Sequence, residues 1–314
     1  MAGRPILAVG GENLIDHVTR DGEVSACPGG SPFNVAMALG RQEMDVHYIS
    51  PISTDRWGDL LTETLLASGV VLTSGRNPAP TTMARVTVSD GVPSYRFERE
   101  RTAERMITHE SLRAALPDGA ASVHTGSLTL TDGADAASWE AFCADCFEEG
   151  RLISLDPNVR LSVIADVSGY RDRILRMCKR VHLLKLSDED LEGLFPGQTQ
   201  PRALEALRAL SSAHLLILTR GSEGVVAQMG SETVELPATD VPALVDTVGA
   251  GDTFTATMLA ALADRNALST AALASLTRDD LILLLRRASL AAALNCGRAG
   301  CNPPSRAEID AAST

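Results

Sequence analysis

The chain has 314 residues, of which 45 % are hydrophobic and 22 % are charged, and its formal net charge is −12. This composition is ordinary for a globular protein and argues against disorder. Nucleic-acid-binding surfaces are basic, so the negative charge argues against nucleic acid and favours a small-molecule partner. The N-terminus lacks the long apolar stretch of a secretory signal, and no segment approaches the roughly eighteen apolar residues of a membrane span. We therefore expect a cytoplasmic protein without a membrane partner.

Apolar runs of strand length alternate with helical patterns along the chain. The strand-like runs lie at 5–11, 47–53, 122–128, 152–158, 182–187 and 215–221, and the helical patterns at 34–42, 58–69, 135–150, 187–195 and 201–212. This alternation predicts β-α-β crossovers and an α/β fold with a doubly wound, mostly parallel sheet flanked by helices. Ligands of such sheets bind outside the carboxyl ends of the strands, so we expect the site in the turns that follow them.

Two segments depart from the alternation. Residues 17–27 and 81–99 each hold an Asp-Gly dipeptide between β-rich runs, which is a strong hairpin signal. Tyr95 and Phe97 would line one side of the second hairpin. We expect a single domain over 1–314 with these two ribbons inserted in it as a small β lid. An antiparallel extension of the main sheet is the alternative.

Residues 244–264 read LVDTVGAGDTFTATMLAALAD, with a Gly-Ala-Gly turn and Asp252 directly before a helical run. Asp252 could simply cap that helix, because aspartate is a favoured N-cap residue. The turn of Gly249, Ala250 and Gly251 indicates more, since small residues let several backbone N–H groups converge on an anion. A carboxylate beside a bound phosphate suits a base that takes a proton from an attacking hydroxyl.

Two well-known phosphate-binding patterns fit poorly. A P-loop requires lysine directly after its glycines, whereas the two lysines of the chain, Lys179 and Lys185, follow no glycine. A dinucleotide-binding fingerprint would begin at VGGEN after the first strand, but the full three-glycine spacing is missing.

The motif DTVGAGDTFTA at 246–256 resembles the C-terminal signature of the ribokinase-like (phosphofructokinase-B-type) carbohydrate kinases. The stretch PGGSPFNVAMALGRQ at 28–42 resembles their N-terminal signature. Further similarity, in GENLID, SLDPNVR, KLSDEDLEGL, LTRGSEG and GRAGCNPPSRAEI, extends over nearly the whole chain and is greatest to the fructokinase branch. The resemblance implies a ribokinase-like fold and a kinase that uses ATP and Mg²⁺ to convert fructose to fructose 6-phosphate.

The resemblance also implies roles on the sugar side. Asp252 would be the general base on the sugar hydroxyl, and the N–H groups of residues 249–251 would stabilise the transferring phosphoryl group. Asp16, Gly30 and Asn34 would bind sugar hydroxyls, which suits carboxylate and amide oxygens. Asn34 could instead cap the helix at 34–42, and Asp16 could simply begin a turn.

On the nucleotide side, the resemblance implies contacts with ATP from Lys185, Ser187, Thr219, Gly221, Arg160 and Ser289. Ser187 and Asp190 form a Ser-x-x-Asp element where the family usually has Asn-x-x-Glu, and Asp190 would organise Mg²⁺ through water. Ser289 stands where many relatives carry an asparagine that contacts adenine. Arg160 could equally be a surface residue of a charged loop.

Two further expectations concern a cation and a partner. In many relatives a K⁺ ion lies beside the Gly-Ala-Gly turn, here residues 249–251 and called the anion turn below. Asp246, Val248 and Gly300 match the positions that hold this ion. The ribbons could also meet the lid of a second subunit and form a homodimer.

Two rival functions stay open. A 2-keto-3-deoxygluconate kinase or another furanose kinase would share the fold, and an acid sugar would need cationic donors from the lid. Arg96, Arg99, Arg101 and Arg105 could supply them. A catalytically silent sugar-binding regulator is the rival of another class, and the intact Gly-Ala-Gly-Asp element argues against it.

Overall fold

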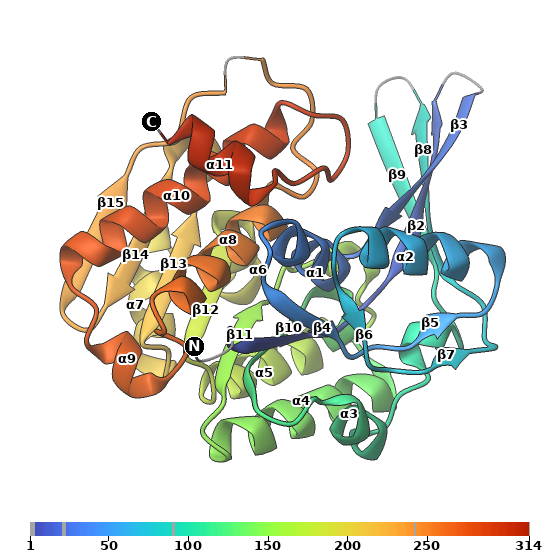
Figure 1. Cartoon of the computed structure of the whole chain (residues 1–314), viewed down its shortest axis with the longest axis horizontal. Helices are drawn as coiled ribbons and strands as arrows, with labels where there is room; N and C mark the ends of the chain where they lie inside the picture. The colour runs from blue at the N-terminus through green and yellow to red at the C-terminus, as the bar shows by residue number, and fades with distance from the viewer. Residues whose placement is uncertain (1–3, 21–22, 90–91, 242, 314) are drawn as a thin grey trace.

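The computed structural model describes residues 4–20, 23–89, 92–241 and 243–313, and its centre is a nine-stranded sheet (Figure 1). From one edge to the other the strands are β15 (Glu232–Leu236), β14 (Val225–Met229), β13 (Leu215–Thr219), β12 (Leu183–Ser187), β11 (Leu152–Asp156), β10 (Ala120–Gly126), β1 (Ile6–Val9), β4 (Asp45–Tyr48) and β6 (Val71–Leu72). The strands from β13 to β6 pair in parallel, and β14 and β15 add an antiparallel edge.

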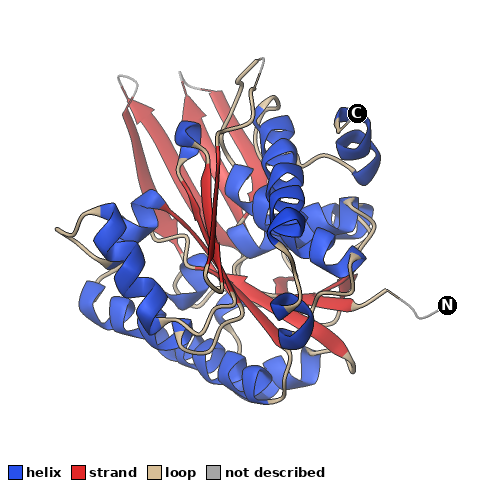
Figure 2. Ribbon diagram, turned by 90° about the vertical axis from the view of Figure 1, so that its left-hand side faces the viewer, coloured by secondary structure: helices blue, strands red, loops and turns tan. Residues whose placement is uncertain are grey.

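Helices cover both faces of this sheet (Figure 2). One face packs against α1 (Ser31–Arg41), α2 (Arg56–Ala67), α8 (Ala250–Asp264) and α10 (Arg278–Cys296). The other packs against α3 (His109–Ala115), α4 (Gly133–Glu148), α5 (Val167–Cys178), α6 (Asp188–Leu194) and α7 (Gln200–Leu210). The short helices α9 (Thr270–Ala274) and α11 (Arg306–Ala312) complete the C-terminal part. The predicted doubly wound, mostly parallel fold is confirmed.

The burial of the strands explains their composition. On β1, Leu7 and Val9 pack into the core of one face and Ala8 into that of the other, because successive side chains point to opposite faces. Every residue of β11 is buried, as expected for a strand covered on both sides. Helix α8 begins with two partly exposed residues, Ala250 and Gly251, and is buried from Asp252 to Ala263.

The two expected ribbons form a separate four-stranded sheet that projects from the body (Figure 1). The first consists of β2 (Leu14–Arg20) and β3 (Glu23–Gly29), and the second of β8 (Thr82–Ser89) and β9 (Val92–Glu98). They join through parallel pairing of β2 with β8, so they do not extend the central sheet. The side chain of Tyr95 lies outside the described part, and Phe97 packs beside Leu14, Ala84 and Leu128.

Two local features differ from expectation. The run 47–53 is divided into β4 and β5 (Ile52–Ser53), because Pro51 interrupts it and β5 pairs instead with β7 (Arg76–Asn77). The hairpin of β14 and β15 was not predicted, since its strands are short and only half buried. Within the described residues, no helix is long and apolar enough to cross a bilayer. A cytoplasmic location stays a prediction.

Candidate active site

Asp252 is the third residue of α8 and does not cap it. The N-cap is Gly249, and Asp252 instead bonds to α1, the first helix of the chain. Its Oδ1 accepts a hydrogen bond from Ser31 Oγ at 2.6 Å, and its Oδ2 accepts one from Asn34 Nδ2 at 2.8 Å. The N-terminal and C-terminal motifs therefore meet at this carboxylate.

The surroundings of Asp252 make it a better proton acceptor than an ordinary aspartate. Burial raises the pKa of its carboxyl, and the bonds from Ser31 and Asn34 lower it by a smaller amount. A base functions best when its pKa approaches the working pH, so the net upward shift is in the useful direction.

The turn before Asp252 requires glycine at one position and leaves backbone donors free. Gly249 has a φ of 75°, and a Cβ there would lie 2.3 Å from Cys301 Sγ. A Cβ on Gly251 would lie 3.0 Å from Lys185 Nζ. The Ala250 N–H bonds to the carbonyl of Thr247 at 3.2 Å, whereas the N–H groups of Gly249 and Gly251 have no partner among the described residues and can donate to an anion such as phosphate.

The three residues expected to bind sugar lie on the elements around this carboxylate. Gly30 is the N-cap of α1 with a φ of 109°, and a Cβ there would lie 2.4 Å from the carbonyl oxygen of Glu12. Asn34 is therefore not the cap, and its buried Oδ1 has no partner in the described part of the chain. Asp16 does not begin a turn, because it lies within β2 opposite Cys27 of β3.

Asp16 and Asp252 belong to one electrostatic neighbourhood. Burial raises the pKa of Asp16 to about 6. Burial raises the pKa of the Cys301 thiol, and the charges of Asp252, Asp16 and Asp246 raise it further, so this partly buried cysteine responds to all three carboxylates.

The expected nucleotide residues occupy the carboxyl ends of adjacent strands. Ser187 ends β12 opposite Thr219 of β13, and Gly221 follows with a φ of 51°. Lys185 is buried, and its Nζ donates to Asp156 Oδ2 at 2.9 Å. These residues lie at the carboxyl ends of the strands, where the crossover topology predicts a ligand site.

Asp190 connects two segments of this edge. Its Oδ2 accepts the N–H of Ser187 at 2.8 Å, and its Oδ1 accepts the N–H of Val159 at 2.6 Å. The neighbouring Arg160 is exposed and donates to the carbonyl of Val159. Both oxygens of Asp190 therefore already hold backbone donors, and a role with Mg²⁺ stays a prediction.

Asp246 contacts the other two positions expected around a monovalent cation, Val248 and Gly300. Its Oδ1 accepts the N–H of Val248 and its Oδ2 that of Gly300, each at 3.0 Å. Asn295 of α10 donates to the carbonyl of Val248 at 2.8 Å, and Ser289 lies earlier on this helix. In the described ranges, no three or more His, Cys, Asp and Glu side chains form a metal-binding cluster.

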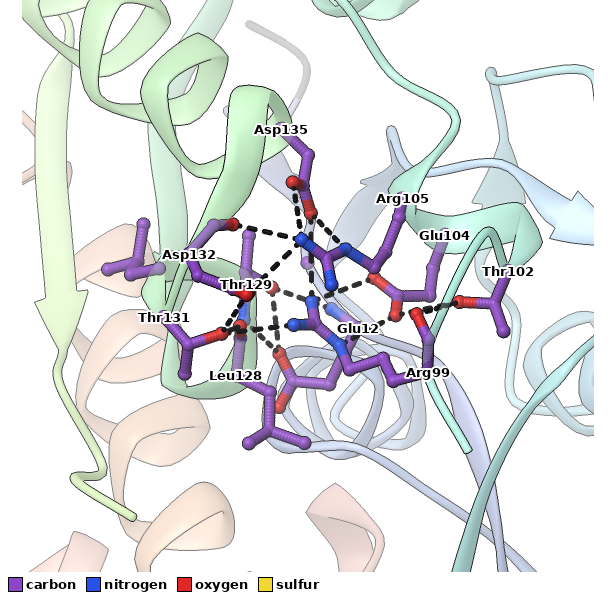
Figure 3. A network of polar contacts seen from close by, with 12 residues as sticks. Glu12, Arg99, Thr102, Glu104, Arg105, Leu128, Thr129, Thr131, Asp132 and Asp135 are labelled. Carbon is purple, nitrogen blue, oxygen red and sulfur yellow. Dashed lines mark hydrogen bonds and ion pairs between the residues drawn. The ribbon is translucent and has the colours of Figure 1, made fainter. Parts of the chain in front are cut away.

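A polar network joins the bases of both ribbons to the body (Figure 3). Glu12 accepts the N–H of Ser31 at 3.1 Å and the hydroxyl of Thr129 at 2.7 Å. Glu104 accepts Arg99 Nε at 2.8 Å and the hydroxyl of Thr82 at 2.9 Å. The start of β8 and the residue after β9 are thus bound to one buried carboxylate.

The comparisons with known proteins agree with this geometry. The profile of the pfkB family carbohydrate kinases matches residues 11–308. The chain belongs to this family. It is 39 % identical over 277 residues to a fructokinase of Rhizobium leguminosarum bv. trifolii, an alignment that covers 86 % of this chain and 84 % of that protein.

Solved structures of kinases show the same fold. A fructokinase from Xylella fastidiosa with bound ATP superimposes with a TM-score of 0.89 at 26 % identity, covering 98 % of this chain and 97 % of that one. A double mutant of the Vibrio cholerae O395 fructokinase, bound to fructose, ADP and potassium, gives a TM-score of 0.84 at 21 % identity, covering 98 % of both chains. The protein is a carbohydrate kinase with the ribokinase-like fold.

Some residues of this pfkB-family site had no role assigned from sequence. From sequence, Asp156 belonged only to the motif SLDPNVR and Glu12 only to the motif GENLID. The available signal was an acidic residue near the carboxyl end of an apolar strand: Asp156 is the last residue of β11, and Glu12 follows β1 by three positions. Their partners, Lys185 and Thr129, are known only once the strands are placed side by side.

Proposed function

We propose that this carbohydrate kinase transfers the γ-phosphoryl group of ATP to a primary hydroxyl of fructose and forms fructose 6-phosphate. One observation carries the proposal: a buried carboxylate, Asp252, lies in the first turn of a helix whose N-cap is a glycine without a side-chain bond, and it is hydrogen-bonded to the N-terminal motif. The similarity to fructokinases supports the choice of sugar.

The chain's own residues suffice to describe the proton transfer. The attacking hydroxyl approaches Asp252, whose carboxylate accepts the proton as the oxygen attacks phosphorus. Ser31 and Asn34 hold the carboxylate in place, and Asp16 and the backbone at Gly30 bind other hydroxyls of the sugar. The N–H groups of residues 249–251 stabilise the negative charge of the phosphoryl group.

The donor nucleotide would occupy the adjoining strand edge. Thr219 and Gly221 would contact phosphates and ribose, and Lys185, Ser187, Arg160 and Ser289 would provide further contacts. Mg²⁺ typically uses few protein carboxylates and several phosphate oxygens. Asp190 would hold Mg²⁺ through water, and Mg²⁺, when bound, neutralises charge on the phosphates.

The ribbon sheet of β2, β3, β8 and β9 would act as a lid on a single domain spanning 1–314. Its inner end carries Asp16 and joins α1 near Asp252, so movement of the ribbons would open or close the sugar site. Closure would exclude water and favour transfer to the sugar. The projecting sheet would also offer a surface for a homodimer.

The geometry favours a neutral sugar over an acid sugar. Of the four arginines considered for a carboxylate, Arg99 is paired with Glu104, and Arg105 with Asp135 at 2.8 Å. Arg99, Glu104 and Asp135 are buried. These two arginines therefore have internal partners, and only Arg96 and Arg101 are exposed.

A panel of sugars with coupled detection of ADP tests the proposal. We expect fructose to give the highest kcat/KM among hexoses, pentoses, furanosides and keto-deoxy acids. A tenfold preference for 2-keto-3-deoxygluconate, which corresponds to about 1.4 kcal/mol in transition-state binding, would assign the acid sugar instead. Sugar binding without any ADP release would indicate a silent regulator.

A further inference from the structure

Directly beneath the anion turn lies a cluster of buried charges that contains one lysine and three aspartates. Lys185 is 5 % exposed, and the three carboxylates, Asp156, Asp190 and Asp252, are each 8 % exposed or less. Buried charges are costly unless paired, and water screens their interactions little. The arrangement of this cluster therefore affects the ionisation of each member.

Lys185 occupies a position between Asp156 and the turn. Its Nζ donates to Asp156 Oδ2 at 2.9 Å, and the hydroxyl of Thr255 on α8 reaches the same oxygen at 3.4 Å. On the other side, the ammonium would meet a Cβ on Gly251 at 3.0 Å. The lysine thus spans from β11 to the backbone of the first turn of α8.

The charges of Asp156 and Lys185 shift the pKa of Asp252 itself, whereas Asp16 of β2 and Asp246 before α8 act on the neighbouring Cys301. Lys185 of β12 lowers the pKa of Asp252, whereas Asp156 of β11 raises it. Cys301, which follows α10, is a thiol whose own pKa is raised by burial and by Asp252. The groups on α1, Ser31 and Asn34, carry no charge, so the pair of Lys185 and Asp156 is the adjustable electrostatic element.

Lys185 is in turn held charged by its neighbours. Burial lowers its pKa, but the charges of Asp156, Asp190 and Asp252 raise it by more. Lys185 therefore stays protonated, and the charge of its partner Asp156 helps to keep the proton on the amine. Removal of either partner would leave the other charge without compensation.

We propose that Lys185 and Asp156 are positioning residues of the kinase reaction, which act through Asp252 and the anion turn from the protein side. The ammonium keeps Asp252 ionised and supports the turn at Gly251. Asp156 orients the ammonium and opposes part of its field, so that Asp252 stays basic enough to accept a proton. The inference rests on the proposed role of Asp252.

Titration of Asp252 in the ligand-free protein tests this role without reference to turnover. The protein is labelled with ¹³C at aspartate carboxyl groups, and the Asp252 resonance is identified by its loss in Asp252→Asn. Lys185→Met should raise the apparent pKa of Asp252 by roughly one pH unit, and Asp156→Asn should lower it by a similar amount. The double variant should return close to the wild-type value, because both charges are gone.

Controls separate an electrostatic effect from general damage. Leu184→Met, on the same strand but facing the opposite core, should leave the Asp252 titration unchanged. If Lys185→Met does not fold, Asp156→Asn and the double variant still give different predictions: the pKa of Asp252 falls in the first and stays close to the wild-type value in the second. Equal shifts in these two variants, or no shift in Asp156→Asn, would refute the proposal.

The pH profile of kcat at saturating fructose provides the second measurement, because it does not include the pH dependence of KM expected from Asp16. The acid limb should move to higher pH in Lys185→Met and to lower pH in Asp156→Asn, in step with the NMR titration. Wild-type protein that turns over no fructose would refute the proposed function and leave the titration result standing. Active wild-type protein with unshifted limbs in both variants would refute the positioning role alone.

Discussion

At the scale of single residues, Asp252 is held by two uncharged donors, so its amide analogue can keep one of the two bonds and the fold. General base catalysis contributes about 10²–10⁴-fold in rate. We expect Asp252→Asn to reduce turnover at least a hundredfold while the melting temperature changes by only a few degrees. Turnover close to that of the wild type, measured by ADP release, would show that the carboxylate is not the base.

Asp16 leads to a prediction about pH. Its pKa of about 6 means that the carboxylate takes up a proton as the pH falls through 6 and then loses its charge as an acceptor. Hydrogen bonds to a charged group contribute about 1.5–3 kcal/mol. KM for fructose should therefore rise about tenfold between pH 7.5 and pH 5.

Asp16→Asn is the control for that pH dependence. Its KM should be higher at every pH and should change little between pH 7.5 and 5, since no titratable group remains there. The same steep rise of KM in this variant would assign the pH dependence to another group.

Sequence motifs predicted which side chains gather at the site better than what those side chains contact. The turn at 249–251 and Asn34 were expected near a phosphate and a sugar, and the structure brings them together around Asp252. The bond between Lys185 and Asp156 joins residues 29 apart on neighbouring strands. Such a pair depends on strand order, which local patterns do not contain.

At the scale of elements, the approach of α1 to the loop before β2 requires a glycine. Gly30 has a φ of 109°, and a Cβ would lie 2.4 Å from the backbone oxygen of Glu12. Strained backbone at such a position costs on the order of 1–3 kcal/mol. We expect Gly30→Ala to lower the unfolding free energy by that amount and to raise KM for fructose, as measured by denaturant titration and kinetics.

Gly75→Ala is the matched control for that substitution. Nothing among the described atoms lies within 4 Å of a Cβ at Gly75, and its φ is not in the left-handed region. Its stability and KM should stay at wild-type values. A similar loss in both variants would point to a general effect of replacing glycine.

The ribbon sheet should respond to ligands as a unit, because β2 pairs with β8 along most of its length. Closure on a bound sugar would restrict opening of its backbone hydrogen bonds. We expect hydrogen exchange in β8 and β9 to slow when fructose and a non-hydrolysable ATP analogue are both present. Helix α5 serves as the internal reference. If hydrogen exchange in β8 and β9 is the same with and without the two ligands, the ribbon sheet is not a lid.

Strands were predicted best where they are buried on both faces. The run at 152–158 was recognised because every residue of β11 is buried and apolar runs are distinctive. The hairpin of β14 and β15 was missed, since each strand has only five residues, β14 alternates between buried and partly buried positions, and β15 buries only Val234. Pro51 was a visible reason to divide the run at 47–53. The prediction followed the pattern of apolar residues instead, and the structure divides the run at the proline.

At the scale of the whole molecule, the alternation of strands and helices was enough to predict the architecture, because parallel crossovers allow few arrangements. It could not predict how distant segments meet. Asp246 lies before α8, yet it accepts an N–H from Gly300, which lies after α10. This contact closes a long stretch of chain beside the anion turn and is a consequence of the packed fold.

The last prediction concerns this contact between Asp246 and Gly300. A monovalent cation at Asp246, Val248 and Gly300 would neutralise a carboxylate near the turn and orient the N–H groups of residues 249–251. We expect kcat to be several-fold higher in potassium chloride than in tetramethylammonium chloride at equal ionic strength. Asp246→Asn should remove most of that difference, because a neutral amide attracts the cation less. Equal rates in both salts for the wild type would show that the segment is stabilised by its hydrogen bonds alone.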